Sequence, residues 1–308
     1  MKNLLLVGGT GFFGKSLIDY LSNNHVKKKF SNIYILSKKK KLNKKNINNL
    51  SVNSLNKDLL KIKKLPKVKY IIYLAKLKNS IQDIKAAKNF IRILKKNILK
   101  EKTHFLYISS GAVYGEIGKK KLIGENYLLK KKRNKFFNLK KEDYAQSKIK
   151  CENFFLNCKT KYLDVRIARC FTFTGEYLDD NKFAIVEFIN SIIRKKKIIL
   201  KSSYQVYRSY MHSKEMSEWL INILLKKNIG QNIFNVGSED KIELNELGKM
   251  LALRFNLKFI QKKKNIKKIN FYVPSVKRYK RIFKFNKKQS SLRAILTTIQ
   301  KKYHEKTY

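Results

Sequence analysis

The feature that most limits the possible folds is a glycine-rich segment that directly follows a short apolar run. The run Leu4–Val7 reads LLLV, and the segment Gly8–Gly14 after it reads GGTGFFG. The apolar run predicts a buried strand, and the pattern after the glycines predicts a helix over 14–23. Glycines between a strand and a helix allow a tight turn, a close approach of the backbone to a ligand and close packing of the helix on a sheet.

The glycine turn also predicts what binds there. Backbone N–H groups at the start of a helix point toward an anion, as they do in sites for dinucleotide pyrophosphates. We therefore place a dinucleotide on this turn and assign its binding to Gly8, Gly11, Phe12, Phe13 and Gly14. The alternative is a glycine turn without a ligand.

Further short apolar runs alternate with segments of helical apolar spacing. The predicted strands are 33–36, 70–74, 105–108, 163–168 and 234–236, and the predicted helices are 84–99, 144–155, 183–194, 215–226 and 244–255. Short apolar runs bounded by helical patterns imply a parallel sheet covered on both faces. The order predicts a doubly wound α/β fold, with ligands at the carboxyl ends of its strands.

The pattern becomes less regular from about residue 169 onward. We expect residues 1–168 to form the nucleotide-binding domain, together with a return segment at about 209–236. Residues 169–308 are expected to form mainly a smaller, interleaved α/β substrate lobe. No repeat and no linker rich in proline, glycine or serine separates these parts.

Charge is the unusual part of the composition. The chain has 308 residues, 43% of them apolar, and a formal net charge of +51. Basic runs such as Lys38–Lys41 fit a nucleic-acid surface. The lysines are spread along the whole chain, however, and they accompany abundant Asn and Ile, whose codons are also rich in A and T. We interpret them as a solvated surface with no specific nucleic-acid partner, whose positive field attracts an anionic substrate.

Other classes of protein are disfavoured by what the chain lacks. No apolar stretch approaches the roughly 18 residues of a membrane-spanning helix, and the first residues are too short for the apolar part of a signal peptide. Cys151, Cys158 and Cys170 are an odd number and lack the Cys-x-x-Cys spacing of zinc sites. We expect a cytoplasmic location, no membrane insertion, no disulfide framework and no metal.

Tyr144 and Lys148 stand four residues apart in a predicted helix, so their side chains share one face. A cation beside a phenol lowers the phenol pKa, and the tyrosine can then exchange a proton with a carbinol or a carbonyl. Ser109 and Ser110 follow the predicted strand 105–108. Hydroxyls at the carboxyl end of a strand can donate to a substrate oxygen. Together with the glycine turn, this pattern predicts an oxidoreductase.

The end of the second predicted strand bears on the choice of cofactor. NAD sites commonly place Asp or Glu there, to accept a hydrogen bond from the ribose 2′-hydroxyl. This chain has Ser37 and Lys38 instead. A hydroxyl and an ammonium favour a 2′-phosphate, so NADP(H) is preferred and NAD(H) is the alternative. Asp58, with Leu59 beside it, is assigned to the adenine end, and the alternative for Asp58 is a helix cap.

These motifs together resemble the extended short-chain dehydrogenase/reductases, specifically their nucleotide-sugar epimerase/dehydratase group with a Rossmann domain. The segments that carry the resemblance are GGTGFFG at Gly8–Gly14, SSGAVYG at Ser109–Gly115, the pair Tyr144 and Lys148, RSYMH at Arg208–His212 and FNVG at Phe234–Gly237. The resemblance covers essentially the full chain.

The resemblance implies a role for each matching residue. Ser110 would hold the sugar hydroxyl or keto oxygen, and Tyr144 would be the acid/base. Lys148 would bind the nicotinamide ribose and lower the pKa of Tyr144. Arg208 would grip the substrate diphosphate, for which a planar guanidinium is well suited, and the pair Leu74–Ala75 would line the cofactor. The group also implies a homodimer.

Departures from the group's sequence patterns reduce the number of reactions that the chain is expected to catalyse. Its 4,6-dehydratases carry an Asp-Glu pair where this chain has Gly111 and Ala112, which we place at the substrate and which cannot exchange a proton. After the strand 163–168, many 4-epimerases have Arg-Tyr-Phe-Asn, whereas this chain reads RCFT at Arg169–Thr172. That variant is more similar to reductases resembling CDP-abequose synthase.

This likeness implies NADPH-dependent reduction of the C4 keto group of a nucleoside-diphosphate (NDP) 4-keto-(di)deoxyhexose, as in deoxysugar biosynthesis for lipopolysaccharide O-antigen. One alternative is an NAD-dependent nucleotide-sugar 4-epimerase. Another is a non-catalytic member that senses a dinucleotide or binds nucleic acid. The presence of Ser110, Tyr144 and Lys148 argues against the non-catalytic alternative.

Overall fold

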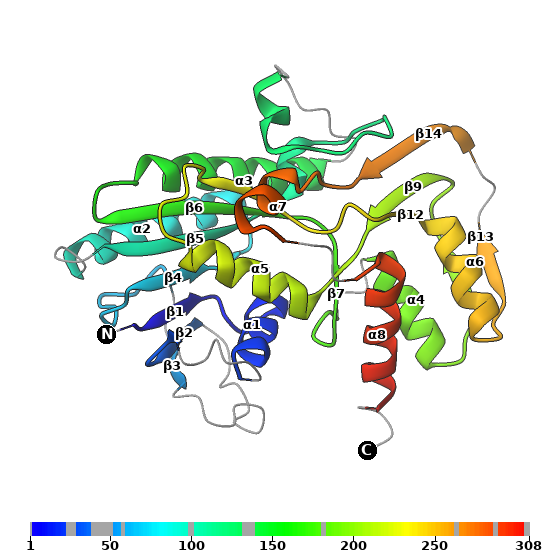
Figure 1. The fold of residues 1–308 in the computed structure, drawn as a ribbon, viewed down its shortest axis with the longest axis horizontal. Helices are drawn as coiled ribbons and strands as arrows, with labels where there is room; N and C mark the ends of the chain where they lie inside the picture. Colours follow the sequence, from blue (N-terminus) through cyan, green and yellow to red (C-terminus); the bar gives the residue numbers. More distant parts are fainter. Residues whose placement is uncertain are drawn as a thin grey trace. The chain divides into compact units, whose positions relative to one another are not determined.

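The computed structural model describes residues 2–22, 29–37, 52–56, 59–97, 102–130, 139–179, 183–261, 265–285 and 289–304. The chain divides into two compact units, whose elements are labelled in Figure 1. The first unit consists of Met1–Val113, Phe136–Cys170 and Ser217–Phe234, and the second consists of Tyr114–Lys135, Phe171–Met216 and Asn235–Tyr308. Each unit is therefore built from segments that lie far apart in the sequence.

A sheet forms the centre of the first unit. In order across the sheet, its strands are β11 (Ile233–Val236), β6 (Leu163–Cys170), β5 (Thr103–Ser110), β4 (Tyr70–Tyr73), β1 (Leu4–Val7), β2 (Ile33–Ser37) and β3 (Val52–Asn56). The boundary between the units falls within β11, after Phe234. All neighbours from β6 to β3 pair in parallel. The strand order changes direction between β1 and β4. In doubly wound folds, ligands bind at the carboxyl ends of the strands beside such a point.

The apolar composition of the strands explains why this sheet is covered on both faces. All four residues of β1 are buried, and so are seven of the eight residues of β5. A strand that is buried throughout needs apolar side chains at consecutive positions, which is typical of parallel sheets between two helical layers.

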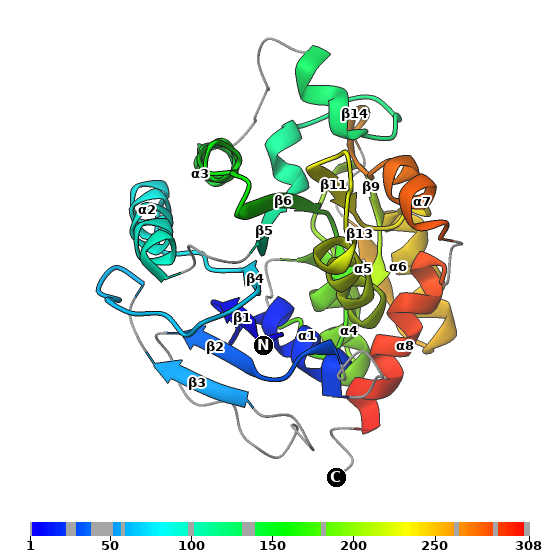
Figure 2. The same ribbon diagram turned by 60° about the vertical axis from the view of Figure 1, so that its left-hand side comes forward.

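Helices supply both layers. They are α1 (Phe12–Ser22), α2 (Ser80–Asn97), α3 (Leu139–Asn157) and α5 (Ser213–Leu225), whose residues from Ser217 onward belong to the first unit. α2 and α3 lie side by side against one face of the sheet, and α1 and α5 lie on the other face (Figure 2). Aromatic rings fill the space beneath α2 and α3, with the rings of Phe105 and Phe155 centred 4.8 Å apart. The predicted doubly wound α/β fold is confirmed.

The second unit contains short strands and helices. Its elements are β7 (Phe173–Thr174), α4 (Ala184–Ile193), β8 (Ile198–Leu200), β9 (Tyr204–Ser209), β10 (Met211–His212), β12 (Lys241–Glu243), α6 (Leu244–Arg254), β13 (Phe259–Gln261), β14 (Asn265–Tyr272), α7 (Lys277–Phe283) and α8 (Ser291–His304). The strands form one three-stranded sheet, β12-β9-β14, and two pairs, β10-β7 and β13-β8. A separate apolar core lies among these elements and includes Phe188, Leu247 and Ile295.

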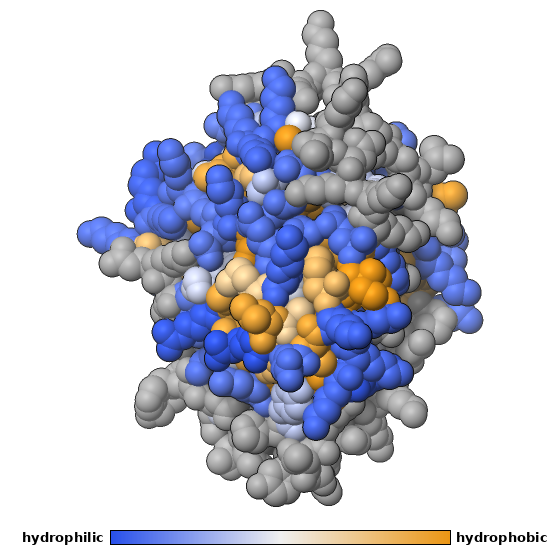
Figure 3. All heavy atoms as spheres, turned by 90° about the vertical axis from the view of Figure 1, so that its right-hand side faces the viewer, coloured by the Kyte–Doolittle hydropathy of each residue, from blue (hydrophilic) through white to orange (hydrophobic). Residues whose placement is uncertain are grey.

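One face of the second unit carries exposed apolar side chains, surrounded by hydrophilic ones (Figure 3). On α6, Leu253 is 86% exposed and Met250 is 45% exposed. Ile199 of β8 and Ile260 of β13 are partners in the parallel register and are 38% and 44% exposed.

Within the part of the chain that the structure describes, no helix combines the length and the apolar character needed to cross a lipid bilayer. The thiols of Cys151, Cys158 and Cys170 are all free, and all three residues are buried.

Candidate active site

The glycine turn between β1 and α1 is held by two close contacts of backbone with backbone. Gly8 has a φ of +84°, and a Cβ at this position would lie 2.7 Å from the Cα of Ala75. At Gly14, a Cβ would lie 2.1 Å from the carbonyl oxygen of Gly9. A side chain is therefore excluded at both glycines. At Gly8 it is excluded by the positive φ of the turn and by the segment after β4. At Gly14 it is excluded by the packing of α1 on the turn.

The same turn is open where a ligand would lie. A Cβ at Gly11 would meet no atom within 4 Å, and α1 begins at the next residue, Phe12. The first N–H groups of a helix have no partner within the helix and carry partial positive charge. Phe12 and Phe13 pack edge to face, with ring centroids 5.4 Å apart. The turn thus fits the pyrophosphate of a dinucleotide.

The structure describes part of the predicted ribose and adenine site. Ser37, at the end of β2, is buried, and its hydroxyl lies within hydrogen-bond distance, 3.1 Å, of the Thr10 hydroxyl in the glycine turn. Leu59 is also buried, and its carbonyl accepts a 2.7 Å hydrogen bond from the Asn89 side chain. Lys38 and Asp58 lie outside the described residues.

The three predicted catalytic residues come together in the first unit. Ser110 is the last residue of β5, and its hydroxyl interacts with the phenol of Tyr144 on α3. One turn further along α3, the Nζ of Lys148 donates a 2.9 Å hydrogen bond to the carbonyl of Ile108 and lies 6.0 Å from the centroid of the Tyr144 ring. The arrangement places a hydroxyl, a phenol and an ammonium at the carboxyl end of β5.

Burial opposes the charged forms of the tyrosine and the lysine of this set. It raises the pKa of Tyr144, whereas the hydrogen bond with Ser110 and the charge of Lys76 lower that pKa. Burial lowers the pKa of Lys148, which is 6% exposed, although nearby acidic groups such as Asp83 and Glu152 raise it. A phenol that is protonated in the resting state is suited to donate a proton.

Gly111 and Ala112 follow Ser110 in a short 3₁₀ turn. The backbone N–H of Ala112 donates a 3.2 Å hydrogen bond to the Ser110 hydroxyl. Neither residue carries a group that can exchange a proton. The immediate continuation of β5 therefore adds no acid or base to the set.

Asp83 is a buried member of the site that the sequence analysis missed. Its carboxylate accepts a 2.6 Å hydrogen bond from the backbone N–H of Leu77 and a 2.7 Å hydrogen bond from the hydroxyl of Ser147. Ser147 directly precedes Lys148 on α3. Asp83 thus joins the segment after β4 to the helix that carries the predicted catalytic pair. The available signal was an acidic residue in the first turn of a helix that directly follows the cofactor-lining segment.

Lys76 was also missed, although it directly follows Leu74 and Ala75, which were assigned to the cofactor. The N–H of Leu74 donates a 2.8 Å hydrogen bond to the carbonyl of Val7, so this segment continues the pairing of β4 with β1. The Lys76 side chain is exposed, and its Nζ lies 4.4 Å from the centroid of the Tyr144 ring.

A buried ion pair joins Glu152 of α3, the helix that carries Tyr144 and Lys148, to Arg169 of β6. The Glu152 carboxylate of α3 accepts hydrogen bonds from Arg169 of β6, at 2.7 Å from Nη2 and 3.1 Å from Nε, and another from the hydroxyl of Ser109 on β5. These bonds connect α3 to two neighbouring strands of the sheet. They fix the position of the helix that carries Tyr144.

Arg208 belongs to the second unit, where it lies on β9. Its Nη1 donates to the carbonyl of Tyr207 at 2.7 Å and to that of Asn270 at 3.4 Å, and its guanidinium carbon lies 5.6 Å from the centroid of the Tyr272 ring. Burial lowers the pKa of Arg208, but a guanidinium remains charged in proteins. The negative charge of Glu116 and the nearby tyrosines, among them Tyr272, raise that pKa.

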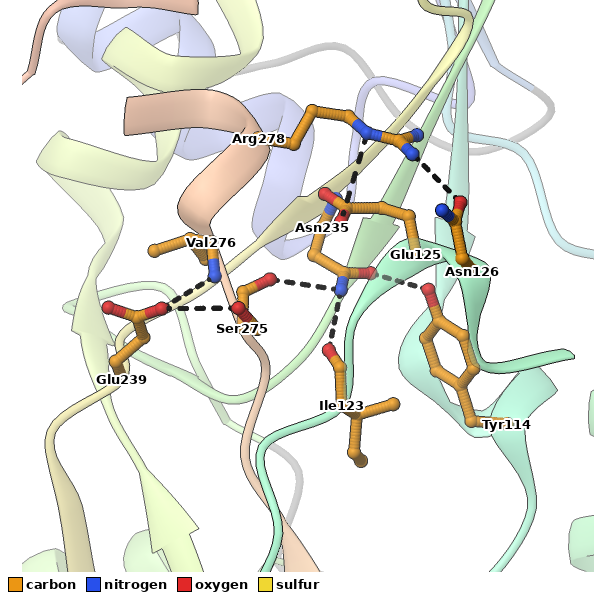
Figure 4. Close-up of polar contacts among 9 residues, drawn as sticks. All are labelled: Tyr114, Ile123, Glu125, Asn126, Asn235, Glu239, Ser275, Val276 and Arg278. Atoms are coloured by element: carbon orange, nitrogen blue, oxygen red, sulfur yellow. Dashed lines mark hydrogen bonds and ion pairs between the residues drawn. The ribbon is translucent and has the colours of Figure 1, made fainter. Parts of the chain in front are cut away.

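The Asn-Val-Gly segment is the centre of a polar network in the second unit (Figure 4). Asn235 is fully buried and accepts a 2.7 Å hydrogen bond from the Tyr114 hydroxyl. Its side-chain amide donates to the carbonyls of Ile123, at 2.8 Å, and Ser275, at 3.2 Å. The Glu125 carboxylate accepts a 3.0 Å hydrogen bond from the Asn235 backbone N–H. One side chain thus holds three distant segments together.

Among the residues that the structure describes, no group of three or more His, Cys, Asp and Glu side chains is arranged to hold a metal ion.

Comparisons with known proteins place these features in a family. The model of the NAD dependent epimerase/dehydratase family matches residues 4–237. No curated protein sequence matches the chain significantly.

Several solved structures have a similar fold. A dTDP-glucose 4,6-dehydratase from Bacillus anthracis, in complex with NAD, has a TM-score of 0.78 and 17% identity, over 99% of this chain and 97% of that one. A UDP-glucose 4-epimerase from Thermotoga maritima has a TM-score of 0.76 and 16% identity, over 99% of each chain. A UDP-N-acetylglucosamine 4-epimerase from Methanobrevibacter ruminantium has a TM-score of 0.73 and 20% identity, over 100% and 99%.

Proposed function

The chain belongs to the NAD dependent epimerase/dehydratase family, and on that premise we propose that it is an NADPH-dependent reductase of the C4 keto group of an NDP-4-keto-(di)deoxyhexose. The observation that carries the proposal is the contact of Tyr144 with Ser110 and with the two lysines, while Gly111 and Ala112 supply no further acid or base. Such a set can protonate one oxygen but has no second group for the elimination of water.

Each residue has a defined task in this reduction. When a reduced nicotinamide is bound, it supplies the hydride. Ser110 donates a hydrogen bond to the keto oxygen, and Tyr144 transfers its phenolic proton to that oxygen as negative charge develops there. Lys148 stabilises the resulting phenolate. Arg208 is the proposed ligand of the substrate diphosphate, because a planar fork of N–H donors matches two phosphate oxygens.

The NADP preference is supported by the residues at the end of β2. Ser37 offers a hydroxyl, and no carboxylate follows it in the sequence before Asp58. A 2′-phosphate is not repelled there, and the net charge of +51 favours an additional anion. A reductase consumes soluble NADPH, whereas a 4-epimerase usually retains bound NAD, so cofactor identity separates the proposal from its alternative.

The test is to mix purified protein with NADPH, and separately with NADH, and a panel of CDP- and dTDP-4-keto-6-deoxy sugars. Loss of reduced-nicotinamide absorbance with NADPH and one of these sugars is the expected result, and it identifies the nucleotide as well. Tyr144→Phe is the matched control and should show no turnover. Turnover with none of the sugars, together with stoichiometric NAD released on denaturation, would replace the proposal with a nucleotide-sugar 4-epimerase.

A further inference from the structure

Lys76 lies where the glycine turn, the end of β4 and the helix α3 approach one another. Its neighbour Ala75 packs against Gly8, where a Cβ would come within 2.7 Å of the Ala75 Cα. The Lys76 Nζ itself lies 4.4 Å from the centroid of the Tyr144 ring, which is a cation–π distance. The lysine is therefore next to both the predicted cofactor turn and the predicted acid.

Lys148, the cation that the sequence pairs with Tyr144, has other principal contacts. Its Nζ donates to the carbonyl of Ile108 at 2.9 Å and lies 4.9 Å from the centroid of the Tyr107 ring. Its distance to the centroid of the Tyr144 ring is 6.0 Å. Lys76 is thus the nearer of the two cations to the Tyr144 ring.

Asp83 holds the backbone next to Lys76 in this position. Its carboxylate binds the N–H of Leu77, the residue after Lys76, and the hydroxyl of Ser147, which lies on α3 between Tyr144 and Lys148. The segment cannot leave α3 without breaking one of these hydrogen bonds. Since Asp83 is 7% exposed, a broken bond would leave a buried charge with fewer partners.

We propose that Lys76 is a second cation of the active site, which stabilises the phenolate that Tyr144 becomes after it has given its proton to the substrate. The proposal rests on the reduction described above. In that step a hydride from the reduced nicotinamide, which is oxidised as its C–H bond breaks, forms a C–H bond at C4 of the sugar. The π electrons of the C4 carbonyl move to oxygen, so the keto group is reduced, and the O–H bond of Tyr144 breaks as the proton joins that oxygen. Solvent then returns a proton to Tyr144. Lys76 acts through Tyr144 and is a positioning residue.

A cation attracts a phenolate more strongly than a phenol, because only the phenolate carries a full negative charge. Other groups around Tyr144 also affect its pKa. Burial has the largest effect and raises its pKa, the hydrogen bond with Ser110 and the charge of Lys76 lower it, and Cys170 and Asp83 raise it. Removal of the Lys76 charge leaves the others in place, so the pKa of Tyr144 must rise further.

The test compares three variants of the full chain. Lys76→Met removes the charge and keeps much of the side-chain length, and Lys76→Arg keeps the charge. Lys85→Met is the matched control, because it removes the charge of another exposed lysine, on α2, and changes the net charge equally. Ionisation of Tyr144 is followed without cofactor or substrate, as the difference in tyrosinate absorbance between each protein and the same protein carrying Tyr144→Phe.

We expect Tyr144 to ionise at higher pH in Lys76→Met than in the wild type, and at the wild-type pH in Lys76→Arg and Lys85→Met. During turnover, Lys76→Met should lower kcat by about fivefold and leave KM unchanged. In the pH profile of kcat for Lys76→Met, the fall in activity at alkaline pH should move to higher pH, because reduction needs the protonated phenol. An unchanged ionisation of Tyr144 in Lys76→Met, or an equal shift in Lys85→Met, overturns the proposal.

Failure of this inference is distinguishable from failure of the proposed reduction. The titration uses the protein alone, so a shift in Lys76→Met without turnover of any keto sugar would keep the electrostatic role of Lys76 and reject the reductase. Turnover without a shift would keep the reductase and reject the role of Lys76.

Discussion

The hydroxyl of Ser147 donates a 2.7 Å hydrogen bond to the carboxylate of Asp83, and this bond connects two segments that are 64 residues apart. The second oxygen of the same carboxylate accepts from the N–H of Leu77. Since Ser147 lies beside Lys148 and Leu77 lies beside Lys76, one buried carboxylate sets the position of both lysines near Tyr144. The geometry of the site thus depends on a residue that is not itself expected to touch the substrate.

Replacement of Asp83 should therefore affect both stability and turnover. Asp83→Ala leaves the N–H of Leu77 and the hydroxyl of Ser147 without their partner, and we expect a loss of about 1–3 kcal/mol in the free energy of unfolding, together with a lower kcat. Asp83→Asn keeps one acceptor and offers the Ser147 oxygen a donor, so it should retain most of the stability. Urea unfolding of both variants checks this. Equal stability of Asp83→Ala and the wild type would contradict it.

Tyr144→Phe removes the proposed proton donor but keeps the ring. We expect kcat to fall by roughly 10²–10⁴-fold, the usual contribution of a general acid, while KM changes little. Ser110→Ala should give a smaller loss, because the hydroxyl only assists. Steady-state kinetics on the keto sugar measure both effects, and circular dichroism controls for folding. Full activity of Tyr144→Phe would refute the assignment.

Two glycines of the same turn should respond differently to alanine. Gly14→Ala places a Cβ within 2.1 Å of the Gly9 carbonyl oxygen, so it should destabilise the fold by more than about 2 kcal/mol. Gly11→Ala places its Cβ in open space and should leave the thermal unfolding temperature nearly unchanged. It should instead weaken binding of the dinucleotide, measured by calorimetry. If Gly11→Ala binds the dinucleotide as the wild type does, the cofactor does not lie against that side of the turn.

Asn235 should be one of the most sensitive positions of the second unit. Asn235→Ala leaves the Tyr114 hydroxyl and the carbonyls of Ile123 and Ser275 without this partner in a buried site, and we expect a loss of about 2–4 kcal/mol of stability. Asn126 is exposed and accepts a 2.9 Å hydrogen bond from Arg278 at the edge of the same network (Figure 4), so Asn126→Ala should cost less than about 1 kcal/mol. Denaturant midpoints compare the two. Similar losses would show that burial of the Asn235 bonds is unimportant.

The stability of the first unit should depend on pH through Asp164. Burial by itself would raise the pKa of Asp164, but the hydrogen bond from His104 and the charge and hydrogen bond of Arg166 outweigh it, and the pKa falls from 3.8 to about 2. A carboxyl with a lowered pKa stabilises the fold above its unfolded-state pKa, and this stabilisation is lost as the pH falls through its folded-state pKa.

We therefore expect Asp164→Asn to lose about 2 kcal/mol at neutral pH, and the deficit to shrink as the pH is lowered from about 4 toward 2. Urea midpoints over this pH range measure the effect. Asp143→Asn, which removes an exposed carboxylate, is the matched control and should show no such dependence. A deficit that is constant with pH would mean that the side chain acts by packing and not by charge.

Local sequence patterns were sufficient to predict the main strands and helices of the first unit. The apolar run of β1, the glycine turn and the helical spacing of Tyr144 and Lys148 depend on residues that are neighbours in the sequence, and backbone sterics and side-chain period act over that range. The predicted helices 183–194 and 244–255 also correspond to α4 and α6. By contrast, β8 and β13 have three residues each, which is too short for a period to be recognised.

The sequence by itself thus determined the doubly wound fold, the glycine turn and the placement of a phenol and an ammonium on one helical face. Only the tertiary structure decided that Lys76 lies against the Tyr144 ring, that Asp83 joins the segment after β4 to α3, and that Asn235 meets a tyrosine 121 residues away. The physical reason is that a strand or helix forms from contacts within a few residues, whereas these pairings require the sheet register and the packing of the helices to be set first.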